Sequence, residues 1–252
     1  MNLLFEVVSD VAKLGLFVAC AEVALNAWSR RLRPQWTAAL TRRRFAVLGI
    51  LTLVVSAIKV IEDVLARESG GVDEAILWFV RDHVPAALGG FFSAVTHSGS
   101  ARVLLPAAFL ATVALLVIRR GFEALLLGVS AATAPLLVYA LKTLVGRARP
   151  ALWETQWYWG SSFPSGHTLS TAAFSTAAAL CVARIRPRYG NLAMSLAIAW
   201  TCLVALSRLV MGVHWPSDVL VAMCLGAFIP LFISVAFDLQ RCKPGTMDKV
   251  AE

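Results

Sequence analysis

The sequence predicts an all-α, polytopic membrane protein with a six-transmembrane-helix core and an additional N-terminal hydrophobic helix. The first observation is composition, since 59% of the 252 residues are hydrophobic and 15% are charged. A soluble domain would carry about 25% charged residues. The second observation is that apolar residues gather in runs of about 20 residues, the length that a helix needs to cross hydrocarbon. The third is that arginine-rich patches separate these runs, as in loops that set membrane topology.

Six apolar runs form the predicted core, which we expect to extend over residues 45–238. The runs are Phe45–Leu65, Val103–Ile118, Phe122–Leu141, Thr168–Ala183, Leu192–Met211 and Ser217–Phe237. Small residues recur in the later runs, as in STAAFSTAAAL, and they allow membrane helices to pack closely. The segment between the first two runs, Ala66–Arg102, contains an amphipathic stretch and is expected outside the membrane.

A seventh hydrophobic segment, about Val7–Trp28, contains Asp10, Lys13 and Glu22. Charged residues make a spanning helix unfavourable unless they face protein. The segment therefore either crosses the membrane with these side chains facing protein or lies in the interface as an amphipathic helix. Residues 1–44 are expected to combine this segment with a basic cytoplasmic loop, and residues 239–252 to form a cytoplasmic tail.

The net charge of +8 arises mainly from basic residues beside the apolar runs. Four clusters lie at alternate ends of the runs: Arg30, Arg31, Arg33, Arg42, Arg43 and Arg44; Arg119 and Arg120; Arg184, Arg186 and Arg188; and Arg241 and Lys243. Six spans place all four clusters on one side, which the positive-inside rule assigns to the cytoplasm. We therefore expect multi-pass insertion in the cytoplasmic (inner) membrane, with the bilayer as partner and no nucleic-acid binding.

Several cations break this rule because they lie at the opposite ends of the runs. They are Lys142, Arg147, Arg149 and Arg208, and His167 and His214 share their side of the membrane. A single such cation is explained by snorkelling to the headgroups. Convergence of these cations with two imidazoles indicates a site that faces the periplasm or the outside.

The stretch SSFPSGHT places a histidine at the start of the fourth run. Pro164 suits the first turn of a helix. We expect the backbone N–H groups of Ser165 and Gly166 to point outward, where the helix dipole favours an anion. His167 lies beside this position and could deliver a proton. The alternative interpretation is a helix-capping serine followed by a buried histidine.

The stretch SRLVMGVHWPSD supplies the second histidine. Arg208 ends the fifth run, and Pro216 begins the sixth helix. Asp218, four residues after His214, can reach its ring nitrogen, fix the tautomer and raise the basicity of the other nitrogen. An imidazole oriented in this way can act as a nucleophile. The alternative role for Asp218 is that of a carboxylate in the first turn of a helix.

The stretch KTLVGRARP supplies fixed cations after the third run. Lys142 and Arg149 suit phosphate oxygens, and arginine can bind them in bidentate fashion. Such cations would stabilise the charge of a phosphoryl-transfer transition state. Arg147 falls outside this pattern; contact with a second phosphate is one interpretation, and snorkelling to the headgroups is the favoured one.

Together these stretches resemble the signature of the type 2 phosphatidic acid phosphatase superfamily. The matching elements are Lys142-x6-Arg149-Pro150, Pro164-Ser165-Gly166-His167 and Ser207-Arg208-x5-His214-x3-Asp218. The resemblance implies a metal-independent phosphatase that needs no cofactor. By the same resemblance, His214 would form a phosphohistidine, Asp218 would orient it, and His167 would protonate the leaving oxygen. The phosphate oxygens would be held by Lys142, Arg149, Ser165, Gly166 and Arg208.

Other histidines and aromatic residues are expected to have structural roles. His83 and His97 lack metal-ligand spacing, and we expect a surface or packing role for both. The loop after the third run holds Trp153, Trp157, Tyr158 and Trp159, which are expected to anchor the loop at the interface or to flank the entry of a lipid tail.

The resemblance favours hydrolysis of a lipid phosphate or diphosphate at the outer face of the membrane. Undecaprenyl diphosphate is the favoured substrate, and phosphatidylglycerophosphate, phosphatidic acid and lipid A phosphate are alternatives. A lipid phosphotransferase remains open, because the phosphohistidine could meet an alcohol instead of water. A non-enzymatic transporter is the third hypothesis, since charges within membranes can mark ion pathways.

Overall fold

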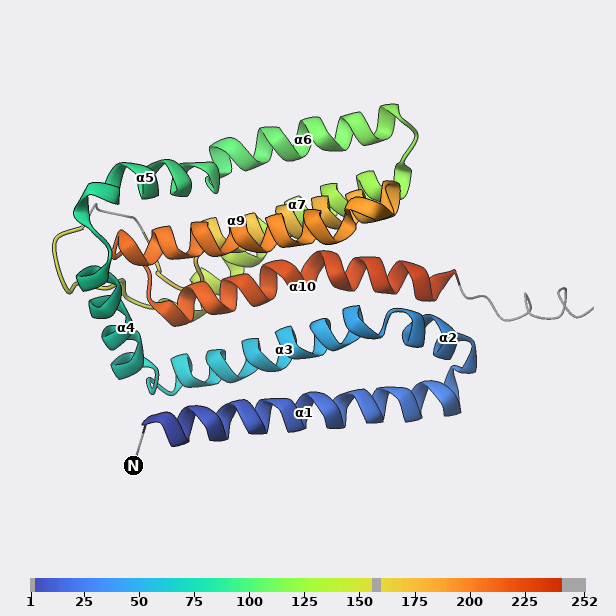
Figure 1. The fold of residues 1–252 in the computed structure, drawn as a ribbon, viewed down its shortest axis with the longest axis horizontal. Helices are drawn as coiled ribbons and strands as arrows, with labels where there is room; N and C mark the ends of the chain where they lie inside the picture. Colours follow the sequence, from blue (N-terminus) through green and yellow to red (C-terminus); the bar gives the residue numbers. More distant parts are fainter. Residues whose placement is uncertain (1–2, 156–159, 242–252) are drawn as a thin grey trace, which may run out of the picture. The chain divides into compact units, whose positions relative to one another are not determined.

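The computed structural model describes residues 3–155 and 160–241, and every regular element in them is a helix (Figure 1). Five of these helices are long and apolar enough to cross a membrane. They are α3 (Arg44–Leu65), α7 (Gly121–Val145), α8 (Gly166–Ile185), α9 (Gly190–Val210, extended at its start by the 3-10 helix η2, Pro187–Tyr189) and α10 (Pro216–Gln240). Each corresponds to a predicted apolar run, which confirms the all-α, multi-pass fold.

The sixth candidate span is a bent pair of helices. α5 (Gly89–Ser98), preceded by the 3-10 helix η1 (Ala86–Leu88), meets α6 (Ala101–Val117) at an angle of 43°. At the bend, a Cβ on Gly99 would lie 2.7 Å from Thr171 Oγ1 and 2.8 Å from Val204 Cγ1, so only glycine allows this approach. The predicted run Val103–Ile118 corresponds to α6, and α5, from the segment assigned to the outside, joins it at this bend.

The remaining part of that segment forms α4 (Gly70–His83), which packs against α9. Its amphipathic pattern explains this packing, because Leu77 is fully buried whereas Phe79 on another face is exposed. Asp73, in the first turn of α4, is also buried.

Residues 57–230 form one compact unit in which α8 packs against α6, α7 and α9. Small residues on α8, such as Ala172, Ala173 and Ala177, are buried and allow this close packing. The ends of α7 and α9 and the starts of α8 and α10 lie at the same end of the unit, together with α4 and α5 (Figure 1). This arrangement brings the three predicted motifs to one end of the helices.

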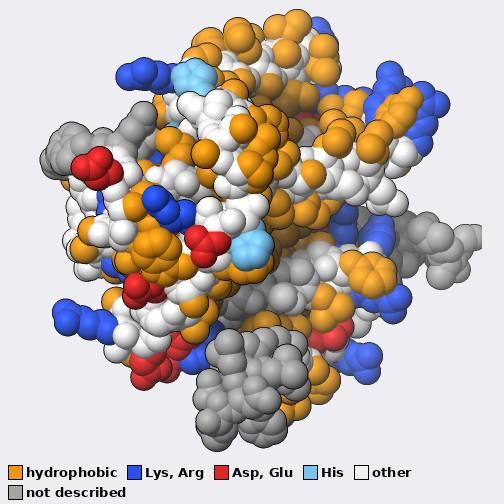
Figure 2. Space-filling view, turned by 60° about the vertical axis from the view of Figure 1, so that its left-hand side comes forward, with side chains coloured by type: hydrophobic (Ala, Val, Ile, Leu, Met, Phe, Trp, Pro, Cys, Tyr) orange, Lys and Arg blue, Asp and Glu red, His pale blue; other side chains and the backbone are white. Residues whose placement is uncertain are grey.

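The outer surface agrees with immersion in lipid. Large apolar side chains are exposed on several helices, among them Phe109, Leu136 and Leu196. Figure 2 shows hydrophobic side chains over much of the visible surface, with charged side chains scattered among them. Contact with hydrocarbon accounts for exposed residues of this kind, which a soluble surface would rarely present in such number.

At Gly226 the backbone of α10 approaches α8 closely. A Cβ there would lie 2.5 Å from the Leu169 carbonyl oxygen and 2.6 Å from Ala172 Cβ. We expect Gly226→Ala to force the helices apart and to lower the free energy of unfolding by about 1–3 kcal/mol. Thermal unfolding of the detergent-solubilised protein measures this loss. Gly49→Ala is the control, because nothing lies within 4 Å of a Cβ at Gly49, and equal melting temperatures for the two variants would contradict the prediction.

The second unit comprises residues 1–56 and 231–252, of which 3–56 and 231–241 are described. It contains α1 (Leu3–Leu32) and α2 (Pro34–Arg42), which pack together, and its small core is formed by Leu40, Val47 and Val235. Arg43 and Asp238 form an ion pair of 2.7 Å. α1 confirms the predicted N-terminal helix.

Candidate active site

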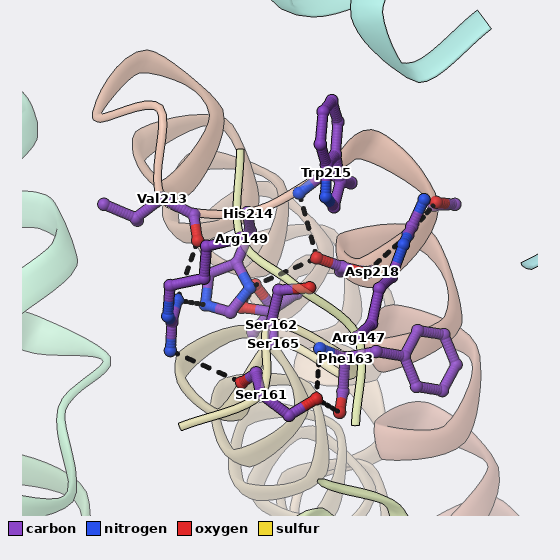
Figure 3. Close-up of polar contacts among 12 residues, drawn as sticks. Arg147, Arg149, Ser161, Ser162, Phe163, Ser165, Val213, His214, Trp215 and Asp218 are labelled. Carbon is purple, nitrogen blue, oxygen red and sulfur yellow. Dashed lines mark hydrogen bonds and ion pairs between the residues drawn. The ribbon is translucent and has the colours of Figure 1, made fainter. Parts of the chain in front are cut away.

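The predicted site residues all belong to the unit of residues 57–230 and lie at helix ends. Lys142 is in the last turn of α7, and Arg149 follows that helix. Ser165 precedes α8, which begins with Gly166 and His167. Arg208 is in the last turn of α9, His214 lies in the following turn, and Asp218 is in the first turn of α10. Figure 3 shows side chains from three of these segments pointing toward one another.

His214 and Asp218 form a buried pair. Their exposed fractions are 2% and 0%, and His214 Nδ1 lies 3.5 Å from Asp218 Oδ2, at the outer limit of a hydrogen bond. The same carboxylate oxygen accepts a bond of 2.9 Å from the Trp215 backbone N–H. Gly212, with φ of 66°, allows the tight turn that brings His214 back toward α10.

Arg149 identifies the state of the His214 ring. Its Nη1 lies 3.4 Å from His214 Nε2 and donates to the Val213 carbonyl oxygen at 2.7 Å. A guanidinium can only donate, so Nε2 presents its lone pair and the ring proton belongs on Nδ1, facing Asp218. The geometry thus leaves Nε2 of His214 directed at the guanidinium of Arg149 (Figure 3).

The surroundings of His214 keep its imidazole neutral. Burial lowers the pKa of His214 from 6.5 to about 4; Arg208 and Arg149 act in the same direction, whereas Asp218 opposes them. The neutral form retains the lone pair that a nucleophile requires. The ring is therefore neutral at neutral pH.

Lys142 and Arg149 share one backbone acceptor. The Lys142 ammonium donates to the Ser161 carbonyl oxygen, and Arg149 Nη2 lies 3.4 Å from the same oxygen. This carbonyl belongs to the segment that leads into α8, so the contact connects the first motif with the second. Two cations held side by side in this way suit the oxygens of a phosphate.

Arg208 is almost fully buried, with 1% of it exposed, and its Nη1 donates to Thr96 Oγ1 at 2.7 Å. Thr96 lies on α5 and did not stand out in the sequence, because no local pattern connects it with Arg208. His167 lies close enough to Arg208, Arg149 and His214 to interact with them electrostatically. The structure therefore brings the predicted cations and both imidazoles together.

The start of α8 differs in one respect from the prediction. The Ser165 backbone N–H donates to the Asp218 carbonyl oxygen at 3.3 Å, so it does not point outward. The Ser165 hydroxyl lies 2.9 Å from Thr168 Oγ1. Leu169 makes the first helical bond, to the Ser165 carbonyl, and the amides of Gly166 and His167 therefore precede the helical ladder and suit an anion.

The prediction for Arg147 was wrong. Instead of snorkelling to the headgroups, its guanidinium forms ion pairs of 2.7 Å with both Asp73 and Asp218. Asp73 was also missed, because it is distant in sequence and belongs to a stretch that resembles an ordinary amphipathic helix. Arg147 lies on the side of the membrane that the positive-inside rule disfavours for a cation, and this position could have indicated a buried carboxylate partner.

The aromatic loop is described only in part, since Trp157, Tyr158 and Trp159 lie outside the described residues. The Trp153 ring covers Gly212, where a Cβ would lie 2.6 Å from its Nε1, and it contacts the Trp78 ring at 5.4 Å. His83 stacks on Phe79, in agreement with the predicted packing role. His97 is exposed in the last turn of α5.

The described residues contain no group of three or more His, Cys, Asp or Glu side chains arranged to hold a metal ion. Cations, helix-start amides and two imidazoles are instead the groups that bind a tetrahedral oxyanion. The fold and site define a multi-pass helical membrane protein with a phosphate-type site at one end of its helices.

Comparison with known proteins gives the family. The PAP2 superfamily matches residues 123–241, which contain all three motifs. A decaprenylphosphoryl-5-phosphoribose phosphatase of Mycobacterium tuberculosis is 36% identical over 130 residues, covering 50% of this chain and 68% of the relative. This chain belongs to the PAP2 superfamily.

Two further similarities concern other bacterial proteins. Lipid A 1-phosphatase of Rhizobium johnstonii is 32% identical over 126 residues, covering 46% of this chain and 47% of the relative, so the match spans about half of that protein. The crystal structure of a transmembrane PAP2-type phosphatidylglycerolphosphate phosphatase from Bacillus subtilis superposes with a TM-score of 0.65 at 24% identity. It covers 75% of this chain and 98% of its own, which supports the fold.

Proposed function

We propose that the protein hydrolyses a lipid phosphate or diphosphate through a phosphohistidine intermediate. The observation that carries this proposal is the position of Arg149 beside His214 Nε2, with Asp218 on the other side of the same ring. A phosphate bound by Arg149 would lie against a nucleophile that is already in the correct tautomer. Relatives named as lipid phosphatases support the same activity.

In the first step, His214 Nε2 attacks phosphorus and the bond to the leaving oxygen breaks. His167, in the imidazolium form that the negative charge of the bound phosphate favours, gives its proton to that oxygen, so the lipid alcohol or lipid phosphate leaves in protonated form. The Nδ1 proton faces Asp218, which stabilises the positive charge that develops on the ring. Lys142, Arg149 and Arg208 stabilise the phosphoryl oxygens.

In the second step, water attacks the phosphohistidine and the N–P bond breaks. His167, now neutral, accepts a proton from the water. Inorganic phosphate leaves and His214 regains its lone pair. Every group required for both steps belongs to the three motifs.

For the substrate, we propose undecaprenyl diphosphate first, with phosphatidylglycerophosphate, phosphatidic acid and lipid A phosphate as alternatives. The site lies at the end of apolar helices, so a lipid could present its phosphate there while its chains stay in hydrocarbon. The relatives' names include a decaprenylphosphoryl compound and lipid A, which supports a long-chain lipid carrier or an envelope lipid. We place the site on the outer face of the inner membrane, opposite the basic clusters.

A substrate panel tests this function. The purified protein is incubated with each lipid phosphate in mixed micelles containing EDTA, and released phosphate is measured. We expect EDTA-resistant turnover of at least one lipid, with the highest kcat/KM for undecaprenyl diphosphate. Absence of phosphate release from every lipid would refute the proposed function, whereas preference for another lipid would correct only the substrate.

The pH dependence of the reaction should reveal the low pKa of His214. Protonation removes the Nε2 lone pair, so loss of kcat/KM from this group is expected near pH 4 instead of near 6.5. Arg149 is one of the charges that lower this pKa. We therefore expect Arg149→Gln to raise the pKa of His214 and to move the acid limb of the residual activity to higher pH.

The substrate contributes its own ionisation near pH of about 6, but this contribution is common to both proteins. The difference between the two pH profiles therefore reports the ionisation of groups on the enzyme. Exposed Arg102, changed to Gln, is the matched control and should leave the limb in place. An Arg149→Gln profile that superposes on the native one after scaling would contradict the prediction.

A further inference from the structure

Arg147 connects two buried carboxylates through four hydrogen bonds. Its Nη1 donates to Asp218 Oδ1 and to Ser217 Oγ, both at 2.7 Å. Its Nη2 donates to Asp73 Oδ2 at 2.7 Å and to Ser69 Oγ at 3.1 Å. The guanidinium therefore uses its rigid fork to relate the start of α4 to the start of α10.

Asp73 also holds the first turn of α10 directly. Its Oδ1 accepts the Ser217 backbone N–H at 2.8 Å, and its Oδ2 accepts the Ser217 hydroxyl at 2.6 Å. An N-terminal backbone N–H has no partner within its own helix, and here a carboxylate from a distant helix supplies one. The turn that carries Asp218 is thereby fixed to α4.

The two oxygens of Asp218 have different tasks. Oδ1 is occupied by Arg147, whereas Oδ2 accepts the Trp215 N–H and faces His214 Nδ1 (Figure 3). A carboxylate bound on one oxygen cannot rotate freely about its last torsion. Oδ2 is thus directed at the imidazole by contacts that involve no phosphate-binding residue.

We propose that Arg147 and Asp73 are positioning residues that orient Asp218, and through it the His214 nucleophile. This inference rests on the proposed phosphatase function. Neither residue would touch the phosphate, because each is engaged with the other and with the first turn of α10. Residues that orient a primary ligand in this manner typically contribute about 10–100-fold to activity.

Kinetics of Arg147→Gln and Asp73→Asn test the proposal. We expect each variant to lose about 10–100-fold in kcat with little change in KM, because substrate binding is kept and the nucleophile is misaligned. Asp63→Asn is the matched control, because it also removes a carboxylate from an ion pair, the exposed contact of 2.6 Å with Lys59 on α3. It should retain native kcat.

A double-mutant cycle with Asp218→Asn separates positioning from general stability. If Arg147 acts through Asp218, adding Arg147→Gln to Asp218→Asn should change kcat by less than about threefold, since neighbouring residues of one network are not additive. If the two substitutions caused independent structural defects, their fold-losses in kcat would instead multiply. A multiplied loss, an undiminished kcat in Arg147→Gln, or a rise in KM alone would overturn the proposal.

Calorimetry with orthovanadate supplies a readout without turnover. Vanadate can take a fifth ligand from the nucleophile, so its binding depends on the alignment of His214 as the transition state does, whereas ground-state binding of the substrate does not. The native protein and Asp63→Asn should bind it equally, whereas Arg147→Gln and Asp73→Asn should bind it about 10-fold more weakly. If the native protein binds vanadate but hydrolyses no lipid in the panel, the proposed function fails while the cycle can still be completed on binding. If it binds no vanadate and releases no phosphate, both proposals are refuted. Native binding by both variants would refute the positioning role alone.

Discussion

Replacing His214 with alanine is expected to lower kcat for phosphate release by at least about 10³-fold, because the covalent route is lost and only oriented binding remains. His214 Nε2 lies 3.4 Å from Arg149 Nη1, and no other imidazole is both paired with a carboxylate and adjacent to that guanidinium in the described part of the chain. The cations remain in place, so KM should change much less than kcat.

Trapping with a radiolabelled lipid phosphate gives an independent measurement. The native protein should retain acid-labile label after rapid quenching, whereas His214→Ala should retain none. His83→Ala is the control, because this exposed histidine contacts Phe79 on α4 and lies outside the site. Label of native amount in His214→Ala, or turnover above a tenth of native, would remove His214 as the nucleophile.

The predicted helices agree with the structure because hydrocarbon imposes one simple requirement. Each span must satisfy its backbone internally and present apolar side chains, so its length and composition are visible in the sequence. The bent span was harder to predict, since its bend depends on Gly99 fitting against Thr171 and Val204 from distant helices. α4 was recognisable as amphipathic, but its packing partner was not.

The residues of the site likewise include some that could be predicted from the sequence and some that could not. The motif residues could be predicted because they lie at helix ends within three short stretches, and the alternation of the spans brings those ends together. Arg147 was misinterpreted because its partner Asp73 lies 74 residues earlier, and no local sequence pattern indicates that the two residues pair. Thr96, which accepts a hydrogen bond from Arg208 at a sequence separation of 112 residues, could not be predicted for the same reason. Short motifs show the groups that act on a ligand, whereas the residues that orient them depend on tertiary contacts.

Asp218→Asn is expected to lower kcat by about 10³-fold, because a carboxylate that orients a catalytic imidazole cannot be replaced by its amide without disturbing the tautomer. The amide would have nearly the same shape, but its NH₂ group would face either Arg147 or His214 Nδ1–H. In the second case His214 would turn its proton toward the phosphate and lose its nucleophilic lone pair on Nε2. In the first case the bond to Arg147, now 2.7 Å, would become a contact between two donors.

Asp238→Asn provides the comparison on the same helix. Asp238 pairs with Arg43 at 2.7 Å near the other end of α10, so its substitution removes an ion pair without touching the site. We expect its kcat to remain native, whereas kcat of Asp218→Asn, measured on folded protein well below its melting temperature, falls by about 10³-fold. Equal effects of the two substitutions would mean that Asp218 matters only for the integrity of α10. A selective loss of kcat in folded Asp218→Asn would instead indicate that the carboxylate acts on the imidazole, because the chemical change and the helix are the same in the two variants.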